Sequence, residues 1–317
     1  MTEPNTEPEN KPGSTEPESD ATAEASPKVD LEHLPEGFEY IEKLVDEPAP
    51  DDQQIREETG QQTTAHQEQQ PYIAFDHVSK SFGDFHVLKD VSFFVNAGET
   101  LCILGRSGVG KSVSLQQLMG FYKPDSGRIL VAGEDIIDFD EEQMQAIRKK
   151  VTMVFQNGAL FDSLSIRENV AFPLRENQHL DEDQIQQIVS GLLEMVGVTG
   201  QSDELPSSLS TGMKRSVAIA RALAAQPEAI LYDEPTTMVD PLIAKLMGDL
   251  IQKLKYQLKL TSIVVTHDMR FAQRLADRVL FLHEGKARFF GTIDEMKASD
   301  DEILCQFLEL DELVLPG

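Results

Sequence analysis

Short apolar runs alternate with amphipathic stretches along most of the chain. Continuous apolar runs predict buried strands, and apolar positions at helical spacing predict helices. The predicted strands are 72–75, 87–95, 100–104, 151–155, 229–232, 262–266 and 279–282. The predicted helices include 113–119, 181–196, 213–225, 241–258 and 303–310. Buried strands that alternate with helices favour an α/β fold around a central parallel sheet.

The stretch 163–225 departs from this alternation because helical patterns dominate it. We interpret it as a helical subdomain inserted into the α/β domain. Further along, Thr292 and Glu295 match a capping box, which marks the start of a helix. We therefore expect one domain over residues 71–298, followed by a C-terminal helix and tail over 299–317.

Residues 1–70 differ in composition from the rest of the chain. They carry 19 acidic and 4 basic side chains, which account for −15 of the formal net charge of −27. A segment this rich in Glu, Pro, Thr and Gln buries too little apolar surface to offset the entropy of ordering. We predict a disordered acidic tail that is dispensable for folding. One patch, Phe38 to Val45, has the alternative interpretation of a short amphipathic docking helix.

Charge and cysteine content exclude several classes of protein. An acidic chain has no whole-surface attraction for nucleic acid, so no nucleic-acid partner is expected. Cys102 and Cys305 are too few for a disulfide framework, and Cys102 lies in an apolar strand, as a small buried side chain would. The start of the chain lacks the apolar core of a secretory signal, and no apolar run is long enough to span a membrane. Any role in transport then depends on docking onto other subunits.

A glycine-rich loop joins strand 100–104 to helix 113–119. It is a full Walker A loop, with the sequence Gly105-Arg106-Ser107-Gly108-Val109-Gly110-Lys111-Ser112. Its glycines let backbone N–H groups converge on phosphate oxygens, and the following helix directs its positive end at the same anion. Lys111 can reach the β- and γ-phosphates, and the Ser112 hydroxyl can bind Mg²⁺. We predict that residues 105–113 bind a nucleotide.

Strand 229–232 ends in two acidic residues, Asp233 and Glu234, which is the Walker B pattern. Asp233 would hold Mg²⁺, and Glu234 would polarise the attacking water as general base. Paired acids at a strand end are by themselves most often a solvated turn. The glycine-rich loop upstream favours the catalytic interpretation.

One further segment and three single residues indicate a function only when they are considered together. The segment Leu209 to Met213, with Ser210 as N-cap, exposes a helix N-terminus suited to an anion. Gln156 follows strand 151–155, His267 follows strand 262–266, and Phe82 lies upstream of the glycine-rich loop. Each also has a simpler interpretation: an ordinary capped helix, a surface amide, a hydrogen-bonded histidine and a core aromatic.

Taken in order, these motifs resemble those of ABC-transporter ATPases, from residue 71 to about 296. The resemblance implies a RecA-like P-loop NTPase core with an antiparallel edge sheet and an inserted helical subdomain. It also implies ATP hydrolysis with Mg²⁺, by a homodimer in which each ATP lies between one chain's Walker A loop and the other chain's signature, residues 210–213.

The same resemblance assigns roles to single residues. It implies that Phe82 stacks on adenine and that Gln156 senses Mg²⁺, the γ-phosphate and the membrane partner. It implies that His267 orients the γ-phosphate and the attacking water. With Glu234 and Lys111, Gln156 and His267 form the predicted catalytic set. Residues 238–240 occupy the place of the D-loop.

A narrower resemblance concerns the segment Asn157–Arg175, together with Met213 and residues 232–237. These are similar to the Mla-type, MCE-associated phospholipid-transport ATPases. That resemblance implies membrane permease subunits, an MCE-domain lipid-binding protein and a peripheral location on the cytoplasmic face of the inner membrane. The apolar residues of the segment would line a groove for the permease or belong to the core: Leu160, Phe161, Ile166 and Phe172.

Three positions depart from the family pattern. Thr211 replaces the usual Gly of the signature, Ser216 replaces a basic residue, and Met238-Val239 replaces Gly-Leu in the D-loop. These departures bear on the rate of hydrolysis more than on ATP binding. An ATPase for another ABC substrate and a catalytically weak, nucleotide-gated regulatory subunit therefore remain alternatives. A soluble ABC protein of DNA repair or translation is disfavoured, because neither a second cassette nor a long coiled-coil insert is present.

Overall fold

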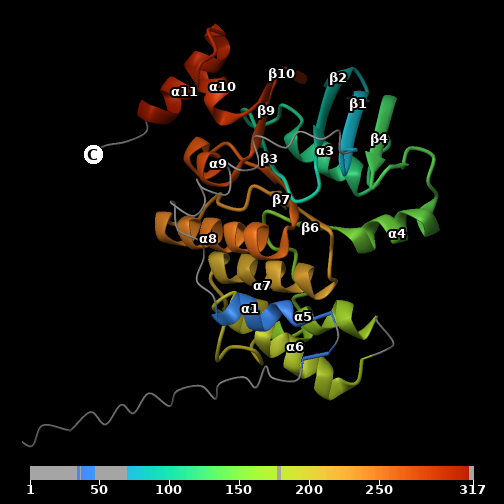
Figure 1. The fold of residues 1–317 in the computed structure, drawn as a ribbon, viewed down its shortest axis with the longest axis vertical. Helices are drawn as coiled ribbons and strands as arrows, with labels where there is room; N and C mark the ends of the chain where they lie inside the picture. The colour runs from blue at the N-terminus through green and yellow to red at the C-terminus, as the bar shows by residue number, and fades with distance from the viewer. Residues whose placement is uncertain (1–33, 36, 47–69, 177–179, 314–317) are drawn as a thin grey trace, which may run out of the picture.

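The computed structural model describes residues 34, 35, 37–46, 70–176 and 180–313. Two sheets organise these residues (Figure 1). A four-stranded antiparallel sheet has the order β2-β1-β4-β5, and a six-stranded sheet has the order β10-β9-β3-β8-β7-β6. In the larger sheet β6, β7, β8, β3 and β9 run parallel, and β10 pairs antiparallel to β9 at one edge. This is the α/β architecture that the sequence pattern predicts, with the antiparallel edge sheet that the family resemblance implies.

The antiparallel sheet consists of β1 (Ile73–Phe82), β2 (Phe85–Val95), β4 (Ser126–Val131) and β5 (Glu134–Asp135). The larger sheet consists of β3 (Thr100–Leu104), β6 (Val151–Val154), β7 (Ala229–Asp233), β8 (Thr261–Val265), β9 (Arg278–His283) and β10 (Lys286–Gly291). The helices of the main body are α3 (Lys111–Leu118), α4 (Glu141–Lys150), α8 (Pro241–Leu258), α9 (Met269–Leu275), α10 (Ile293–Lys297) and α11 (Glu302–Leu313).

The five parallel strands of the larger sheet are buried on both faces, which explains their continuous apolar runs. Side chains alternate along β3: Cys102 and Leu104 pack into the core shared with the helices, and Leu101 and Ile103 pack into the core shared with the antiparallel sheet. Because β3, β7 and β8 are neighbours and parallel, the loops after their carboxyl ends meet at one edge. Ligands bind at such an edge in open α/β sheets.

Some strands and one helix differ from the sequence-based predictions. Strand β1 extends to Phe82, beyond the predicted 72–75, because its second half contains one buried residue, Val78, and so has no continuous apolar run. Strands β4, β5 and β10 and helix α4 were not predicted. They carry many polar side chains on their exposed faces, so they lack the apolar runs that identified the central strands.

A group of helices lies at one end of the molecule (Figure 1). It contains α5 (Ile166–Arg175), α6 (Glu182–Met195), the short 3-10 helix η1 (Pro206–Ser208) and α7 (Thr211–Ala224). These elements fall within the predicted helical stretch 163–225. Capping boxes start α5 and α6 at Ser165 and Asp181, and the predicted capping box of Thr292 and Glu295 starts α10. Such caps satisfy the unpaired N–H groups of the first turn.

Helix α1 (Tyr40–Asp46) lies against these helices and near α8 (Figure 1). Phe38, Ile41 and Leu44 are at most 2% exposed and belong to the helical core. The Tyr40 hydroxyl donates to the Leu223 carbonyl at 3.2 Å. The prediction of disorder is therefore wrong for residues 37–46, whereas the alternative of a short amphipathic helix is correct. The acidic average of residues 1–70 hid three apolar side chains at helical spacing; most of the remaining segment lies outside the described residues.

Two further expectations concern the buried cysteine and membrane-spanning helices. Cys102 is fully buried and not in a disulfide, and burial raises the pKa of its thiol far above the usual value. Among the described helices, none is both long and apolar enough to cross a membrane.

Candidate functional site

The glycine-rich loop 105–110 joins β3 to α3 and needs its glycines for steric reasons. Gly105 and Gly110 adopt φ values of 145° and 106°. A Cβ on Gly105 would lie 2.4 Å from the Leu282 carbonyl oxygen, and one on Gly110 would lie 2.6 Å from the Leu88 side chain. Any larger residue would push the loop away from β9 and β2. The sequence therefore fixes the curvature that directs the backbone of the loop into the cleft.

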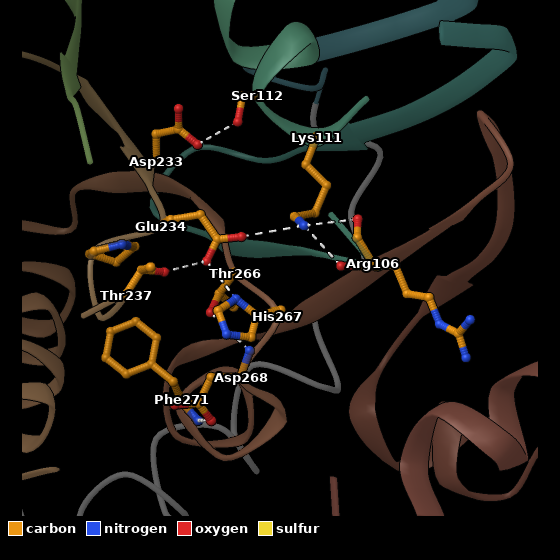
Figure 2. A network of polar contacts seen from close by, with 12 residues as sticks. Arg106, Lys111, Ser112, Asp233, Glu234, Thr237, Thr266, His267, Asp268 and Phe271 are labelled. Carbon is orange, nitrogen blue, oxygen red and sulfur yellow. Dashed lines mark hydrogen bonds and ion pairs between the residues drawn. The ribbon is translucent and has the colours of Figure 1, made fainter. Parts of the chain in front are cut away.

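Lys111 begins α3, and its side chain is 6% exposed. Its ammonium donates to the carbonyl oxygens of Gly105, at 2.8 Å, and Arg106, at 3.2 Å. It also lies 3.3 Å from Glu234 Oε1. The predicted phosphate-binding cation and the predicted general base thus point toward each other (Figure 2).

Asp233 ends β7 and accepts a hydrogen bond from the Ser112 hydroxyl at 2.7 Å. Burial raises the pKa of Asp233, and the neighbouring Glu234 charge adds to that effect, whereas the bond from Ser112 and the Lys111 charge oppose it. The pair places two hard oxygen atoms side by side. Hydroxyl and carboxylate oxygens, completed by phosphate and water, are the usual surroundings of Mg²⁺.

The carboxylate of Glu234 is held on its second oxygen as well. His267 Nδ1 lies 2.8 Å from Glu234 Oε2, and the Thr237 hydroxyl donates to the same atom at 2.9 Å (Figure 2). Glu234 has a φ of 49°, a left-handed conformation that a non-glycine residue rarely adopts. Sequence reasoning did not identify Thr237, because its spacing from Glu234 acquires meaning only through the turn that follows β7.

The predicted residues at the mouth of the site also come together. Gln156, Phe82 and His267 line one cleft with the glycine-rich loop, Val113 and Glu234. Phe82 is 42% exposed and makes an edge contact with Tyr122, with 5.0 Å between ring centroids. Two further aromatic residues of this cleft, Phe85 and Phe307, were not predicted. Phe307 comes from α11, so no local motif connects it to the loop.

The signature lies away from the cleft of its own chain. Ser210 caps α7, with its hydroxyl accepting from the Met213 N–H at 3.3 Å. Thr211 follows at the exposed start of this helix. Among the described residues, those that line the nucleotide cleft do not include 210–213. In the D-loop, Met238 is 90% exposed, and Asp240 caps α8.

The cleft fits a Mg²⁺-nucleotide. Its volume is about 830 Å³, within the range of small-molecule sites. A Cβ on Gly108 would meet nothing within 4 Å, so this part of the loop faces open space that a phosphate can enter. Within the described part of the chain, no group of three or more His, Cys, Asp or Glu side chains could hold a metal ion.

Comparisons with known proteins agree with this geometry. The profile of the family described as ABC transporter matches residues 88–237. The chain is 40% identical to the intermembrane phospholipid transport system ATP-binding protein MlaF of Haemophilus influenzae, over 72% of this chain and 86% of that protein. It is also 40% identical to the chloroplast protein trigalactosyldiacylglycerol 3 of Arabidopsis thaliana, over 73% of this chain and 71% of that protein.

Two other relatives extend the comparison. A probable ribonucleotide transport ATP-binding protein, mkl of Mycobacterium leprae, is 37% identical over 73% of this chain and 67% of that protein. The dimeric, post-hydrolysis structure of the ATP-binding cassette MJ0796, bound to ADP and phosphate, superposes with a TM-score of 0.65 and 30% identity. That alignment covers 70% of this chain and 98% of the cassette.

The fold and the site define a P-loop ATPase that uses ATP and Mg²⁺. More narrowly, the chain belongs to the ATP-binding subunits of the ABC-transporter family and resembles the Mla-type members of it.

Proposed function

We propose that this chain energises the transport of phospholipid or a related lipid through a separate membrane permease, acting as a homodimer on the cytoplasmic face of the inner membrane. The similarity to MlaF over 86% of that protein supports the lipid class. The similarity to mkl, named for ribonucleotide transport, is the main support for another substrate. An MCE-domain lipid-binding protein would join the assembly through the permease.

The observation that carries the proposal is the surface formed by the segment after Gln156. Phe161 is 44% exposed and Phe172 is 45% exposed, with their ring centroids 5.0 Å apart. Ile166, in contrast, is fully buried and so belongs to the core, the second of the two alternatives; Leu160 is partly buried against the same core. We call Phe161 and Phe172 the aromatic pair. It is the part of the segment Asn157–Arg175, which we call the Mla-like segment, that a permease helix would contact.

Polar groups hold Phe161, one member of the aromatic pair, in place. Asn169, which is fully buried, accepts from the Phe161 N–H at 2.8 Å and donates to the Phe161 carbonyl at 3.1 Å. The guanidinium of Arg221 lies 5.6 Å from the centroid of the Phe161 ring. Arg221 also donates to the Gly158 carbonyl at 3.1 Å. This support favours a preformed docking surface over a mobile loop.

Exposed residues near the signature support the homodimer. Because the signature does not line its own cleft, a second copy would have to supply it. Leu242 and Leu246, one helical turn apart on α8, are 65% and 54% exposed and continue from the exposed Met238. This apolar row and the dimeric form of MJ0796 support association through the D-loop face.

In the closed dimer the site residues of this chain would each have a separate role in ATP hydrolysis. Ser112 and Asp233 would hold Mg²⁺, which supplies charge neutralisation at the phosphates. Lys111 would leave Glu234 for the γ-phosphate, and Glu234 would then accept a proton from the attacking water. Thr237 and His267 would keep that carboxylate aligned. Gln156, directly before the Mla-like segment, would connect the nucleotide to the aromatic pair.

The test is reconstitution of the full chain with its permease in lipid vesicles. We expect ATP-dependent movement of fluorescent phospholipid between the vesicles and the lipid-binding partner. Phe172→Asp should abolish the stimulation of ATP hydrolysis by the permease and leave the hydrolysis by the chain alone unchanged. Phe121→Asp, at a residue 49% exposed outside the Mla-like segment, is the matched control. Stimulation by ribonucleotide but not by lipid would refute the lipid class.

A further inference from the structure

Arg215, in the first half of α7, is a buried cation held by backbone carbonyls. It is 2% exposed. Its Nε donates to the Gln156 carbonyl at 2.8 Å, and its Nη1 donates to the Pro235 carbonyl at 2.7 Å. Its Nη2 donates to the carbonyl of Thr237. One guanidinium therefore connects the signature helix to the Q-loop that begins at Gln156 and to the turn after β7.

The acceptors explain why this residue is arginine. A guanidinium presents its donors in a rigid planar fork, whereas an ammonium is a single point of charge on a flexible stem. The three carbonyls are uncharged, so they do not neutralise the buried cation as a carboxylate would. Burial lowers the pKa of Arg215, and only the more distant Glu234 charge opposes this effect. Burial of a cation without a neutralising carboxylate is unfavourable, so we interpret the position of this guanidinium as important for the protein.

The turn that Arg215 holds is strained. Glu234 and Met238 both adopt left-handed conformations, with φ values of 49° and 61°. Non-glycine residues persist in this region only where the surrounding structure enforces it, and such residues gather at functional sites. The carbonyls of Pro235 and Thr237 lie between these two positions. The two bonds from Arg215 therefore fix the part of the backbone that would otherwise relax.

A second hydrogen bond connects Thr237 to the carboxylate of Glu234. The carbonyl of Thr237 accepts from Arg215, and the hydroxyl of the same Thr237 donates to Glu234 Oε2 at 2.9 Å. His267 Nδ1 lies 2.8 Å from that same oxygen. Arg215 is thus one residue removed from the carboxylate that would activate water.

We propose that Arg215 is a positioning residue for ATP hydrolysis. Its guanidinium fastens the backbone of the Q-loop and of the D-loop turn to the signature helix. Glu234 is thereby aligned, and the three segments move together when the helical subdomain moves. This role concerns hydrolysis itself and does not depend on which substrate the transporter carries.

The test compares Arg215→Met and Arg215→Lys with the wild-type full chain at saturating Mg²⁺-ATP. We expect kcat to fall about 10- to 100-fold in Arg215→Met, the range caused by small misplacements of catalytic groups. The dissociation constant for ATP should change less than about twofold, because the glycine-rich loop is untouched. Arg215→Lys should keep the charge but recover only part of kcat. Hydrogen exchange should accelerate at residues 156–158 and 235–240 in both variants.

Lys255→Met is the control for a general loss of stability. Lys255 is also a buried cation, 7% exposed, but it donates to Leu275 and Asp277, away from the site. This variant should lose stability without losing kcat. Equal losses of kcat in Lys255→Met and Arg215→Met would overturn the proposal, as would wild-type kcat in Arg215→Met.

Chemical rescue provides a test that does not depend on the fold of Arg215→Met. Arg215→Ala leaves a space for free guanidinium ion at millimolar concentration, well below denaturing levels. Recovery of kcat by guanidinium, but not by equal concentrations of ammonium, is the expected result. If both ions fail in a folded Arg215→Ala protein, or if both act equally, the fork geometry has no role and the proposal is wrong.

Discussion

The ammonium of Lys111 lies 3.3 Å from Glu234 Oε1, and both side chains are largely buried, at 6% and 14% exposure. The cation of the glycine-rich loop and the proposed general base therefore share one contact. A γ-phosphate that enters the loop must compete with this carboxylate for the same ammonium. The negative charge of Glu234 therefore serves catalysis but opposes the binding of ATP.

The first prediction follows from this pair. Glu234→Gln keeps the shape of the side chain but removes the competing charge and the base. We expect hydrolysis to fall at least about 10²-fold, because general-base catalysis contributes that much or more. ATP should bind at least as tightly as to the wild type, and an ATP-stabilised dimer should accumulate. Single-turnover hydrolysis, equilibrium ATP binding and size-exclusion chromatography measure the three effects.

Glu284→Gln is the matched control for that change, because Glu284 is 81% exposed and away from the cleft. It should leave both rate and affinity unchanged. Near-normal turnover in Glu234→Gln would remove Glu234 from the role of general base.

The second prediction concerns pH and stability at Asp233. Its pKa is raised in the folded chain, chiefly by burial, so the folded chain binds this proton more tightly than the unfolded chain does. Protonation therefore stabilises the fold, and that contribution is lost as the pH rises through the folded-state pKa. Asp233→Asn imitates the protonated form. It should raise the free energy of unfolding at neutral pH while abolishing Mg²⁺-dependent hydrolysis.

Urea titrations without Mg²⁺ or nucleotide check this prediction. The stability difference between Asp233→Asn and wild type should shrink as the pH falls and vanish below the usual carboxyl pKa of 3.8. Asp300→Asn, at an exposed position, should show no such trend. A difference that is independent of pH would contradict the assignment to burial of the carboxylate.

The third prediction concerns Thr211, at the exposed first position of α7. A Cβ on the next residue, Gly212, would lie 2.5 Å from the Ile243 side chain, so the start of α7 is pressed against α8 and cannot retreat. The bulk of Thr211 would then hold a closed dimer slightly open. Thr211→Gly should raise permease-coupled ATP turnover and leave the ATP affinity of the isolated chain unchanged.

Thr211→Ser separates bulk from hydrogen bonding, because it removes the methyl group and keeps the hydroxyl. If the hydroxyl binds the partner's phosphate, Thr211→Gly should hydrolyse ATP more slowly and Thr211→Ser should not. That pattern would show the steric account to be wrong.

The fourth prediction reverses the expectation that residues 1–70 are dispensable. Ile41 on α1 is fully buried against the helical core. Ile41→Ala should cost about 2–5 kcal/mol, the range for buried aliphatic truncations. Deletion of residues 1–46 should lower the thermal midpoint at least as much. Calorimetry and urea unfolding measure both effects.

Glu42→Ala provides the comparison on the same helix, because Glu42 is exposed. A surface change of this kind should stay within about 0.5 kcal/mol. If Ile41→Ala is as stable as Glu42→Ala, α1 does not dock in solution.

Local patterns were enough to predict the central strands, the glycine-rich loop and the acidic pair after β7. A strand that is buried on both faces has a continuous apolar sequence, and a phosphate-binding loop needs glycines at a fixed spacing. Strand β3 and helix α8 accordingly have the predicted bounds. The order of motifs was sufficient to indicate the family. The individual roles of Phe82, Gln156 and His267 remain predictions, although all three line the predicted cleft.

Contacts between distant segments were decided only by the tertiary structure. Arg215 and the Gln156 carbonyl are 59 residues apart, and Tyr40 and the Leu223 carbonyl are 183 apart. Carbonyl acceptors have no residue identity, so the three partners of Arg215 leave no trace in the sequence pattern. Helix α1 was hidden for a related reason: its three buried side chains are too few to shift the composition of an acidic segment. They become a core only against α6 and α8, which the chain supplies more than a hundred residues later.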